Sequence, residues 1–158
     1  MLIDTWHFSF TVSDLERSIT FYRDILGMEL VHTQEQANAY TRKFVGYADA
    51  HLKVAQFKIP GKEPSRSGHV LELVEYVAPK GVRVDTSTPN PGTAHLAFEV
   101  DDIHAEFARL KALGVRFRSE APVAIEAGIN KGGYTCYFLD PDDITLEMVQ
   151  PPPRSQTA

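Results

Sequence analysis

The sequence has almost no cysteine, no long apolar run and no excess of positive charge, and each shortage excludes a class of protein. The one cysteine, Cys136, cannot form a disulfide within the chain, and its apolar neighbours favour a buried thiol over a nucleophile. No stretch approaches the roughly 20 apolar residues of a membrane-spanning helix, and the N-terminus lacks the pattern of a secretory signal. A net charge of −5 with scattered basic residues gives no footprint for nucleic acid. We therefore expect a cytoplasmic protein that binds neither membranes nor nucleic acid.

Apolar side chains, by contrast, are abundant enough for a core. Of the 158 residues, 43% are hydrophobic, which is about what one domain requires. We expect this domain to span residues 1–150. The proline-rich residues 151–158 cannot continue a sheet, so we expect them to form a flexible tail.

A repeat organises the chain. The segment HFSFTVSDL at residues 7–15 returns as HLAFEVDDI at 95–103, an offset of 88 residues. Later, LELV at 71–74 returns as LEMV at 146–149, an offset of 75 residues. The duplication therefore predicts two modules, which we place at about 1–78 and 93–150. The residues between them, 79–92, contain several prolines and are expected to be a linker.

The first module begins with a predicted strand over residues 5–12. Polar and apolar residues alternate there, which would place Trp6, Phe8, Phe10 and Val12 on a core-facing side. The spacing of Ser13 and Glu16 indicates a capping box at the start of a helix that ends at Gly27. Further strands are expected at residues 28–33, 40–45, 52–59 and 70–77.

The second module repeats this order. We expect a strand over 93–100, a cap at Asp101 and a helix over 103–113 that stops at Gly114. Three more strands are predicted at residues 115–118, 133–139 and 144–150, whereas residues 122–131 have no clear pattern. Apart from the weakly patterned candidate at residues 40–45, each module is thus predicted to run strand, helix and then three strands.

Each module carries a histidine in its first predicted strand and a glutamate in its last: His7 and Glu72, then His95 and Glu147. A single such glutamate would most simply point to solvent, but two at matched positions favour a shared role. Burying a carboxylate costs several kcal/mol unless it is paired or bound to a cation. Imidazole and carboxylate suit a divalent first-row metal, and two of each leave open positions on an octahedral ion. These four residues are the predicted metal ligands. The histidines without matched partners are interpreted as surface or loop residues: His32, His51, His69 and His104.

The chain resembles the vicinal oxygen chelate superfamily, which includes glyoxalase I, methylmalonyl-CoA epimerase, extradiol dioxygenases, fosfomycin-resistance transferases and bleomycin-resistance proteins. The resemblance covers about residues 5–150. It is carried by TVSDLERS at 11–18, FY at 21–22, LGM at 26–28, LEL at 71–73, HLAF at 95–98 and DPD at 140–142. It implies an α+β fold in which two βαβββ modules form a curled mixed sheet around a metal-binding cleft.

Ligand positions distinguish members of this superfamily. Glyoxalase I uses a histidine and a glutamate from each module, which correspond to His7, Glu72, His95 and Glu147. Extradiol dioxygenases and fosfomycin transferases match only three of these and have no ligand at the position of Glu72. Bleomycin-resistance proteins have no metal ligands.

The resemblance therefore implies a metal-dependent lyase or isomerase that moves a proton next to a metal-chelated carbonyl of a small molecule. Glu147 is the expected base, with Glu72 the second candidate. One divalent transition metal is implied, from among Ni, Co, Zn, Mn and Fe. Two alternatives stay open: an iron(II) extradiol-type dioxygenase, and a metal-free protein that binds a small molecule or drug through Trp6, Tyr76 and Tyr134. Relatives often complete their clefts across two chains, so we expect a homodimer.

Three positions depart from the glyoxalase I pattern. Thr11 stands where an arginine helps to bind the glutathione carboxylate, and Tyr76 stands in place of an asparagine. The resemblance therefore does not extend to glutathione binding. Asp143 takes the place of the glycine that usually follows Asp-Pro-Asp, which indicates a different turn.

Overall fold

The chain folds as two units, Met1–Val84 and Asp85–Ala158, each with its own sheet and helices. The boundary falls inside the predicted linker at 79–92. The computed structural model describes residues 1–64 and 66–153, so the predicted tail lies outside the described residues from 154 onward. Within the described part of the chain, no helix has the length and apolar character to cross a membrane. We describe each unit by itself.

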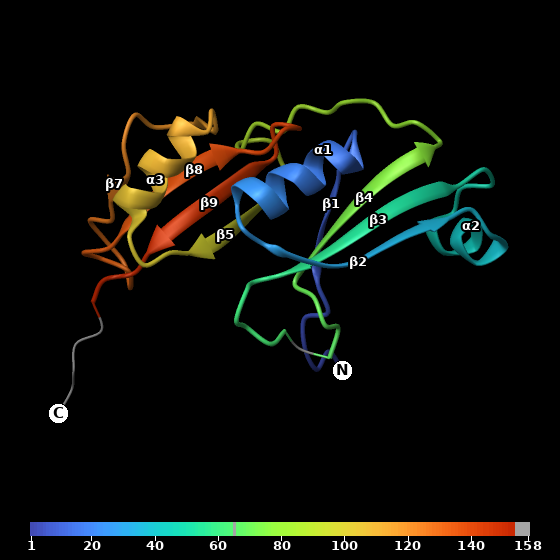
Figure 1. The fold of residues 1–158 in the computed structure, drawn as a ribbon, viewed down its shortest axis with the longest axis horizontal. Coiled ribbons are helices and arrows are strands. Elements are labelled where there is room, and N and C mark those ends of the chain that lie inside the picture. Colours follow the sequence, from blue (N-terminus) through green and yellow to red (C-terminus); the bar gives the residue numbers. More distant parts are fainter. Residues whose placement is uncertain (65, 154–158) are drawn as a thin grey trace. The chain divides into compact units, whose positions relative to one another are not determined.

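The first unit is built on a four-stranded mixed sheet (Figure 1). Its order is β1-β4-β3-β2, in which β1 runs parallel to β4 and the other neighbours are antiparallel. Along the chain the elements are β1 (Phe8–Thr11), α1 (Leu15–Ile19), η1 (Thr20–Ile25), β2 (Glu29–Gln36), α2 (Ala39–Val45), β3 (His51–Lys58) and β4 (Leu71–Ala78). The π-helical segment η1 continues α1 directly.

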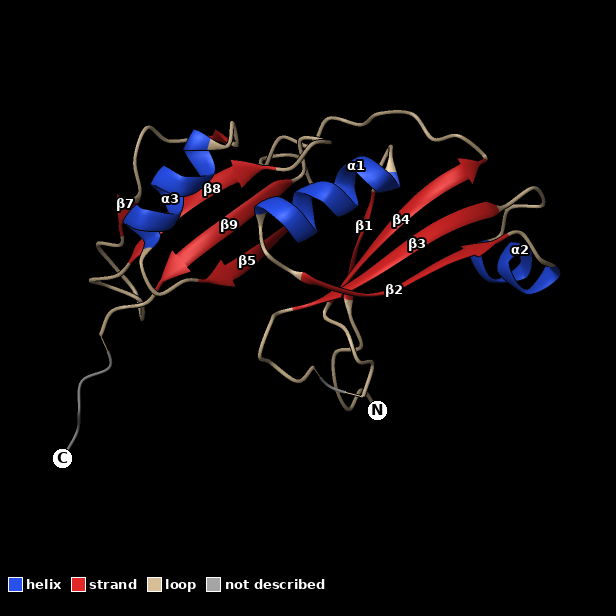
Figure 2. Cartoon of the chain, in the orientation of Figure 1, coloured by secondary structure: helices blue, strands red, loops and turns tan. Residues whose placement is uncertain are grey.

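The second unit repeats this plan with a five-stranded sheet. The order is β5-β9-β8-β6, with β7 also paired to β8, and β5 runs parallel to β9. Its elements are β5 (His95–Glu99), α3 (Ile103–Ala112), β6 (Arg116–Phe117), β7 (Val123–Ala124), β8 (Tyr134–Leu139) and β9 (Thr145–Gln150). In Figure 2, α3 lies along β8 and β9 within this unit, as α1 lies along the sheet of the first unit. The α+β class with two mixed sheets is confirmed.

Helices α1 and α3 are each capped at the N-terminus by an aspartate. The Asp14 carboxylate accepts a hydrogen bond from the backbone N–H of Arg17 at 3.0 Å, and Asp102 accepts one from Ala105 at 2.9 Å. The predictions of a Ser13 capping box and a cap at Asp101 were therefore wrong by one residue. The reason is local, since a short carboxylate three residues before an N–H satisfies a donor that the helix itself cannot pair.

Each helix is also tied to the last strand of its unit. The N–H of Leu15 donates to Glu75 Oε2 on β4 at 2.9 Å, and the N–H of Ile103 donates to Gln150 Oε1 on β9 at 2.9 Å. Leu15 and Ile103 are related by the offset of 88 residues, and Glu75 and Gln150 by the offset of 75. These bonds fix the start of each helix over the sheet.

Strand register divides the side chains of β3 and β4 between two faces. Phe57, Leu71 and Leu73 are buried on the helix side, whereas Gln56 and Glu72 lie on the opposite face, which they share with the buried Leu52 and Val54. On β1, Phe10 is buried, but Trp6 is 59% exposed. The prediction that Trp6 faces the core was wrong, because β1 begins only at Phe8 and its alternation does not reach residue 6.

The weakly patterned segment at residues 40–45 forms a helix and not the predicted strand. The Asn38 side chain accepts a hydrogen bond from the N–H of Thr41 at 2.9 Å, and Gly46 ends the helix with a left-handed φ of 80°. Tyr40 and Phe44, four residues apart, stack on one face. The helix is an insertion between β2 and β3, so the first unit runs βαβαββ.

Candidate metal centre

Strand register places the histidine and the glutamate of each unit on one face of its sheet. Ser9 lies opposite Glu72 in the β1–β4 pair, and Ala97 lies opposite Glu147 in the β5–β9 pair. His7 and His95 stand two residues before these partners, and side chains two residues apart share a face. His7 itself lies one residue before β1, whereas His95 is the first residue of β5. Both units therefore present their His–Glu pair in the same way.

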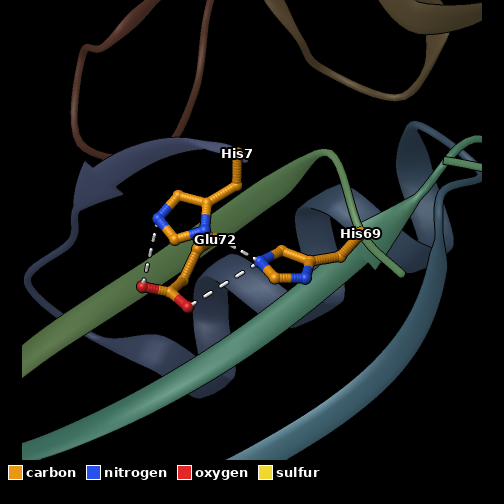
Figure 3. Close-up of side chains that lie close together, drawn as sticks. All are labelled: His7, His69 and Glu72. Atoms are coloured by element: carbon orange, nitrogen blue, oxygen red, sulfur yellow. Dashed lines mark hydrogen bonds and ion pairs between the residues drawn. The ribbon is translucent and has the colours of Figure 1, made fainter. Parts of the chain in front are cut away.

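In the first unit the pair is close but not hydrogen-bonded. His7 Nε2 lies 3.8 Å from Glu72 Oε1 (Figure 3), and the Glu72 side chain is only 17% exposed. Gln56, directly opposite Glu72 on β3, donates from Nε2 to Glu72 Oε2 at 3.0 Å. That bond holds one carboxylate oxygen and leaves the other directed at the histidine.

His69 joins this pair, contrary to its interpretation as a surface or loop residue. It does precede β4 in a loop, but it is only 4% exposed, and its Nε2 lies 3.0 Å from His7 Nδ1 and 3.9 Å from Glu72 Oε2. One ligand atom from each of His7, His69 and Glu72 falls within 4.8 Å of the other two. Of the remaining histidines, His32 and His104 are exposed, and His51 lies on β3 with its Nε2 2.5 Å from Glu35 Oε1.

In the second unit the pair is in direct contact. His95 Nε2 lies 3.1 Å from Glu147 Oε2, and the Glu147 side chain is again 17% exposed. The Thr135 hydroxyl on β8 donates to Glu147 Oε1 at 2.5 Å. The ring of Tyr137 lies 5.3 Å from the His95 ring in a tilted arrangement. Both carboxylate oxygens of Glu147 therefore have a partner.

These distances fit metal ligation within each unit. Two donor atoms that are each about 2.1 Å from one ion can be at most about 4.2 Å apart. The separations of 3.8 Å for His7 and Glu72 and 3.1 Å for His95 and Glu147 fall within this limit. The structure thus brings the predicted ligands together in pairs, one pair to a unit, and their union into one four-ligand site stays a prediction.

The buried thiol of the second unit is not part of this chemistry. Cys136 is 3% exposed, and burial, with a smaller contribution from the Glu147 charge, raises its pKa to about 11. The thiol therefore stays protonated at neutral pH, which agrees with its interpretation as a buried hydrophobic residue and not a nucleophile.

Sequence reasoning missed the side chains that support the pairs. Gln56 and Thr135 do not correspond in the repeat, since in strand register Gln56 faces Glu72 whereas Tyr137 faces Glu147. A period-2 pattern predicts which face a residue takes but not which neighbour it bonds. His69 could have been found from its position three residues before Glu72, had matched partners not been required.

The chain matches the glyoxalase/bleomycin resistance protein/dioxygenase superfamily over residues 6–148. Two mixed sheets, each with a His–Glu pair in matching strand register, are consistent with that match. The chain belongs to this superfamily, and the resemblance deduced from the sequence is confirmed.

Individual relatives cover nearly the whole chain. A probable lactoylglutathione lyase from Vibrio parahaemolyticus is 34% identical over 149 residues, which is 91% of this chain and 88% of the relative. A 2-epi-5-epi-valiolone epimerase from an Actinomyces species is 33% identical over 92% of this chain and 78% of its own length. Among solved structures, a glyoxalase family protein from Bacillus cereus has a TM-score of 0.77 at 20% identity and covers 96% of both chains. This last likeness concerns the fold alone.

The relatives named lactoylglutathione lyase imply a divalent metal. The grouping of His7, His69 and Glu72 supplies imidazole nitrogens and a carboxylate, which are suitable donors for a first-row divalent ion.

Proposed function

We propose that this protein is a metal-dependent lyase or isomerase similar to glyoxalase I, which transfers a proton next to a carbonyl of a small molecule. The observation that carries the proposal is the duplicated His–Glu pair in matching strand register, Ser9 opposite Glu72 and Ala97 opposite Glu147. A carboxylate at the position of Glu72 is the feature that separates the glyoxalase-like ligand pattern from the three-ligand pattern of the dioxygenases.

The ligands of the proposed centre are His7, Glu72, His95 and Glu147. A bound divalent cation would act as a Lewis acid, polarising a carbonyl oxygen and so acidifying the neighbouring C–H. Which of Ni, Co, Zn, Mn or Fe is bound is a question for elemental analysis. Whether the two pairs combine within one chain or across a homodimer is a question for light scattering and a metal-loaded crystal structure; we propose the homodimer, in the cytoplasm.

Glu147 is the proposed base. Its Oε2 lies 3.1 Å from His95 Nε2, so an imidazole stands beside the oxygen that would receive the proton. The Thr135 hydroxyl holds the other oxygen and fixes the plane of the carboxylate. A positioned carboxylate of this kind contributes typically about 10²- to 10⁴-fold as a general base.

The substrate is a small molecule with a hydrogen on the carbon next to a carbonyl. The Vibrio relative is named for lactoylglutathione, whose lactoyl group carries such a hydrogen beside the thioester. The departures at Thr11 and Tyr76, however, remove two side chains of the glyoxalase I pattern for glutathione. We therefore propose that the carbonyl chemistry is retained and that the thiol carrier differs.

The second candidate is an epimerase. The relative named 2-epi-5-epi-valiolone epimerase is about as similar as the lyase, and inversion beside a ketone needs the same removal and return of a proton. An uncharged polyhydroxy ketone would need no arginine at position 11. The threonine at this position therefore favours such a substrate.

The experiment follows proton exchange in deuterated water by NMR, using protein loaded in turn with Ni(II), Co(II), Zn(II), Mn(II) and Fe(II). S-lactoylglutathione and 2-epi-5-epi-valiolone are the two probes, and protein stripped with a chelator is the control. We expect metal-dependent exchange of the hydrogen next to the carbonyl in at least one probe, and faster exchange of the valiolone probe would favour the epimerase over the lyase. Exchange in neither probe, together with oxygen uptake on catechols by the iron-loaded protein, would contradict the proposal and favour the dioxygenase.

A further inference from the structure

His69 is the one side chain of the candidate centre that the repeat does not account for. The matched position in the second unit is Ile144, which is also buried. A buried imidazole must satisfy two ring nitrogens, whereas isoleucine has no polar side-chain atom to satisfy. The repeat therefore does not explain why the first unit has a buried histidine at this position.

Backbone contacts fix which nitrogen of His69 carries the proton. His69 Nδ1 lies 3.0 Å from the backbone carbonyl oxygen of Ser67. A carbonyl can only accept, so Nδ1 must donate, and in a neutral ring Nε2 is then left with a lone pair. The Ser67 hydroxyl also donates to the His69 carbonyl oxygen at 2.7 Å, which holds this loop in place.

The lone pair on His69 Nε2 determines in turn which ring nitrogen of His7 carries the proton. His69 Nε2 lies 3.0 Å from His7 Nδ1 (Figure 3), so His7 Nδ1 must be the donor in that hydrogen bond. A neutral His7 then has its own lone pair on Nε2, the nitrogen that lies 3.8 Å from Glu72 Oε1. The chain of bonds from Ser67 through His69 therefore directs the basic nitrogen of His7 toward the glutamate.

We propose that His69 is a positioning residue, which selects the Nδ1-protonated form of His7 and so presents His7 Nε2 as the metal ligand. The proposal rests on the proposed function, because it gives a role to a ligand of that centre. Ligating histidines are held in this way by a partner on the other ring nitrogen, and removal of such a partner typically weakens metal binding about 10- to 100-fold.

The hydrogen bond to His7 favours this role over direct ligation by His69. His69 Nε2 lies 3.0 Å from His7 Nδ1, so its lone pair is already engaged as the acceptor of that bond. If His69 Nε2 bound an ion, its lone pair would no longer be available, and His7 Nδ1 would lose its acceptor. The two roles exclude one another, so one measurement can separate them.

The first test needs no metal. The ¹⁵N shifts of the imidazole nitrogens, recorded on metal-free protein at a pH where the rings are neutral, report which nitrogen is protonated. We expect both His7 and His69 to carry the proton on Nδ1, with the His7 signals assigned through the variant His7→Asn. A wild-type His7 protonated on Nε2 would overturn the proposal.

The second test measures Zn(II) and Co(II) affinity by competition with a chelator. His69→Phe keeps an aromatic ring but removes both nitrogens, and we expect about 10- to 100-fold weaker binding. His69→Gln restores an oxygen that can accept from His7 Nδ1, so it should recover most of the loss. His104→Phe makes the same change at an exposed histidine of the other unit and should leave the affinity unchanged.

The outcomes separate the two proposals. Unchanged affinity in His69→Phe, or a ¹⁵N shift showing His69 Nε2 bound to Zn(II) in the wild type, would overturn the positioning role and leave the proposed function intact. Wild-type protein that binds neither metal would contradict the proposed function, while the metal-free NMR measurement would still decide how His69 and His7 are protonated.

Discussion

The two units share a backbone plan but surround it with different side chains. In both, an aspartate caps the helix, the last strand pairs in parallel with the first, and the glutamate lies opposite the second residue after the histidine. They differ around the carboxylate: Gln56 and His69 approach Glu72, whereas Thr135 and His95 hold Glu147. The duplicated backbone thus determines the position of each glutamate, and the neighbouring side chains determine its hydrogen bonds.

The largest expected effect contrasts the two glutamates. Glu147→Gln should slow proton exchange by about 10²- to 10⁴-fold, since an amide cannot take up the proton. Glu72→Gln keeps an oxygen donor, so we expect a smaller loss in exchange rate, accompanied by weaker metal binding. NMR exchange rates at saturating metal make the comparison. A larger loss for Glu72→Gln would transfer the role of base to the first unit.

Core substitutions compare the packing of the two sheets. Leu71 and Leu146 are related by the offset of 75 residues, and both are 0% exposed. Either change to alanine should lower the free energy of unfolding by about 2 to 5 kcal/mol, because it removes buried methyl groups and leaves a cavity. Urea denaturation is the measurement, with the exposed Val82→Ala as control. A cost no greater than that of the control at either position would contradict the assigned core.

Helix caps provide a smaller matched pair. Asp14→Ala and Asp102→Ala each remove one hydrogen bond to a helix N–H, and each should cost about 1 kcal/mol in unfolding free energy. Asp14→Asn and Asp102→Asn keep an oxygen at the same place and should cost much less. If the asparagine variants lose as much as the alanine variants, the carboxylates do not act as caps.

The smallest effect concerns a turn. Gly68 and Asp143 occupy matched positions, and both have a left-handed φ, 75° and 64°. A Cβ on Gly68 would meet no atom within 4 Å, so Gly68→Ala should cost only the backbone strain, about 1 kcal/mol.

Asp143 tolerates this conformation better than most residues, and its carboxylate pairs with Arg116. In Asp143→Gly the relief of strain and the loss of an exposed ion pair nearly cancel, so thermal unfolding should change little. A large loss of stability there would show that the ion pair, and not the backbone, sets this turn.

The repeat is what made the fold and the pairs predictable from sequence. Strand alternation and the two offsets located β1, β4, β5 and β9 to within three residues, whereas the parallel pairing of β1 with β4 and of β5 with β9 is known only from the structure. The same reliance on matched positions hid His69, whose counterpart is Ile144. It also gave no guide to α2, an insertion in which strand-favouring and helix-favouring residues are mixed and which is bounded as a helix by Asn38 and Gly46.

The account depends most on the claim that the His–Glu pairs of both units hold a divalent metal. The direct measurement is the affinity for Zn(II) and Co(II) of the wild type, Glu72→Gln and Glu147→Gln, with elemental analysis of the native protein to identify the metal. We expect the native protein to contain a transition metal, and each variant to bind both ions at least about tenfold more weakly. A native protein without a transition metal, or equal affinity in all three, would contradict the account.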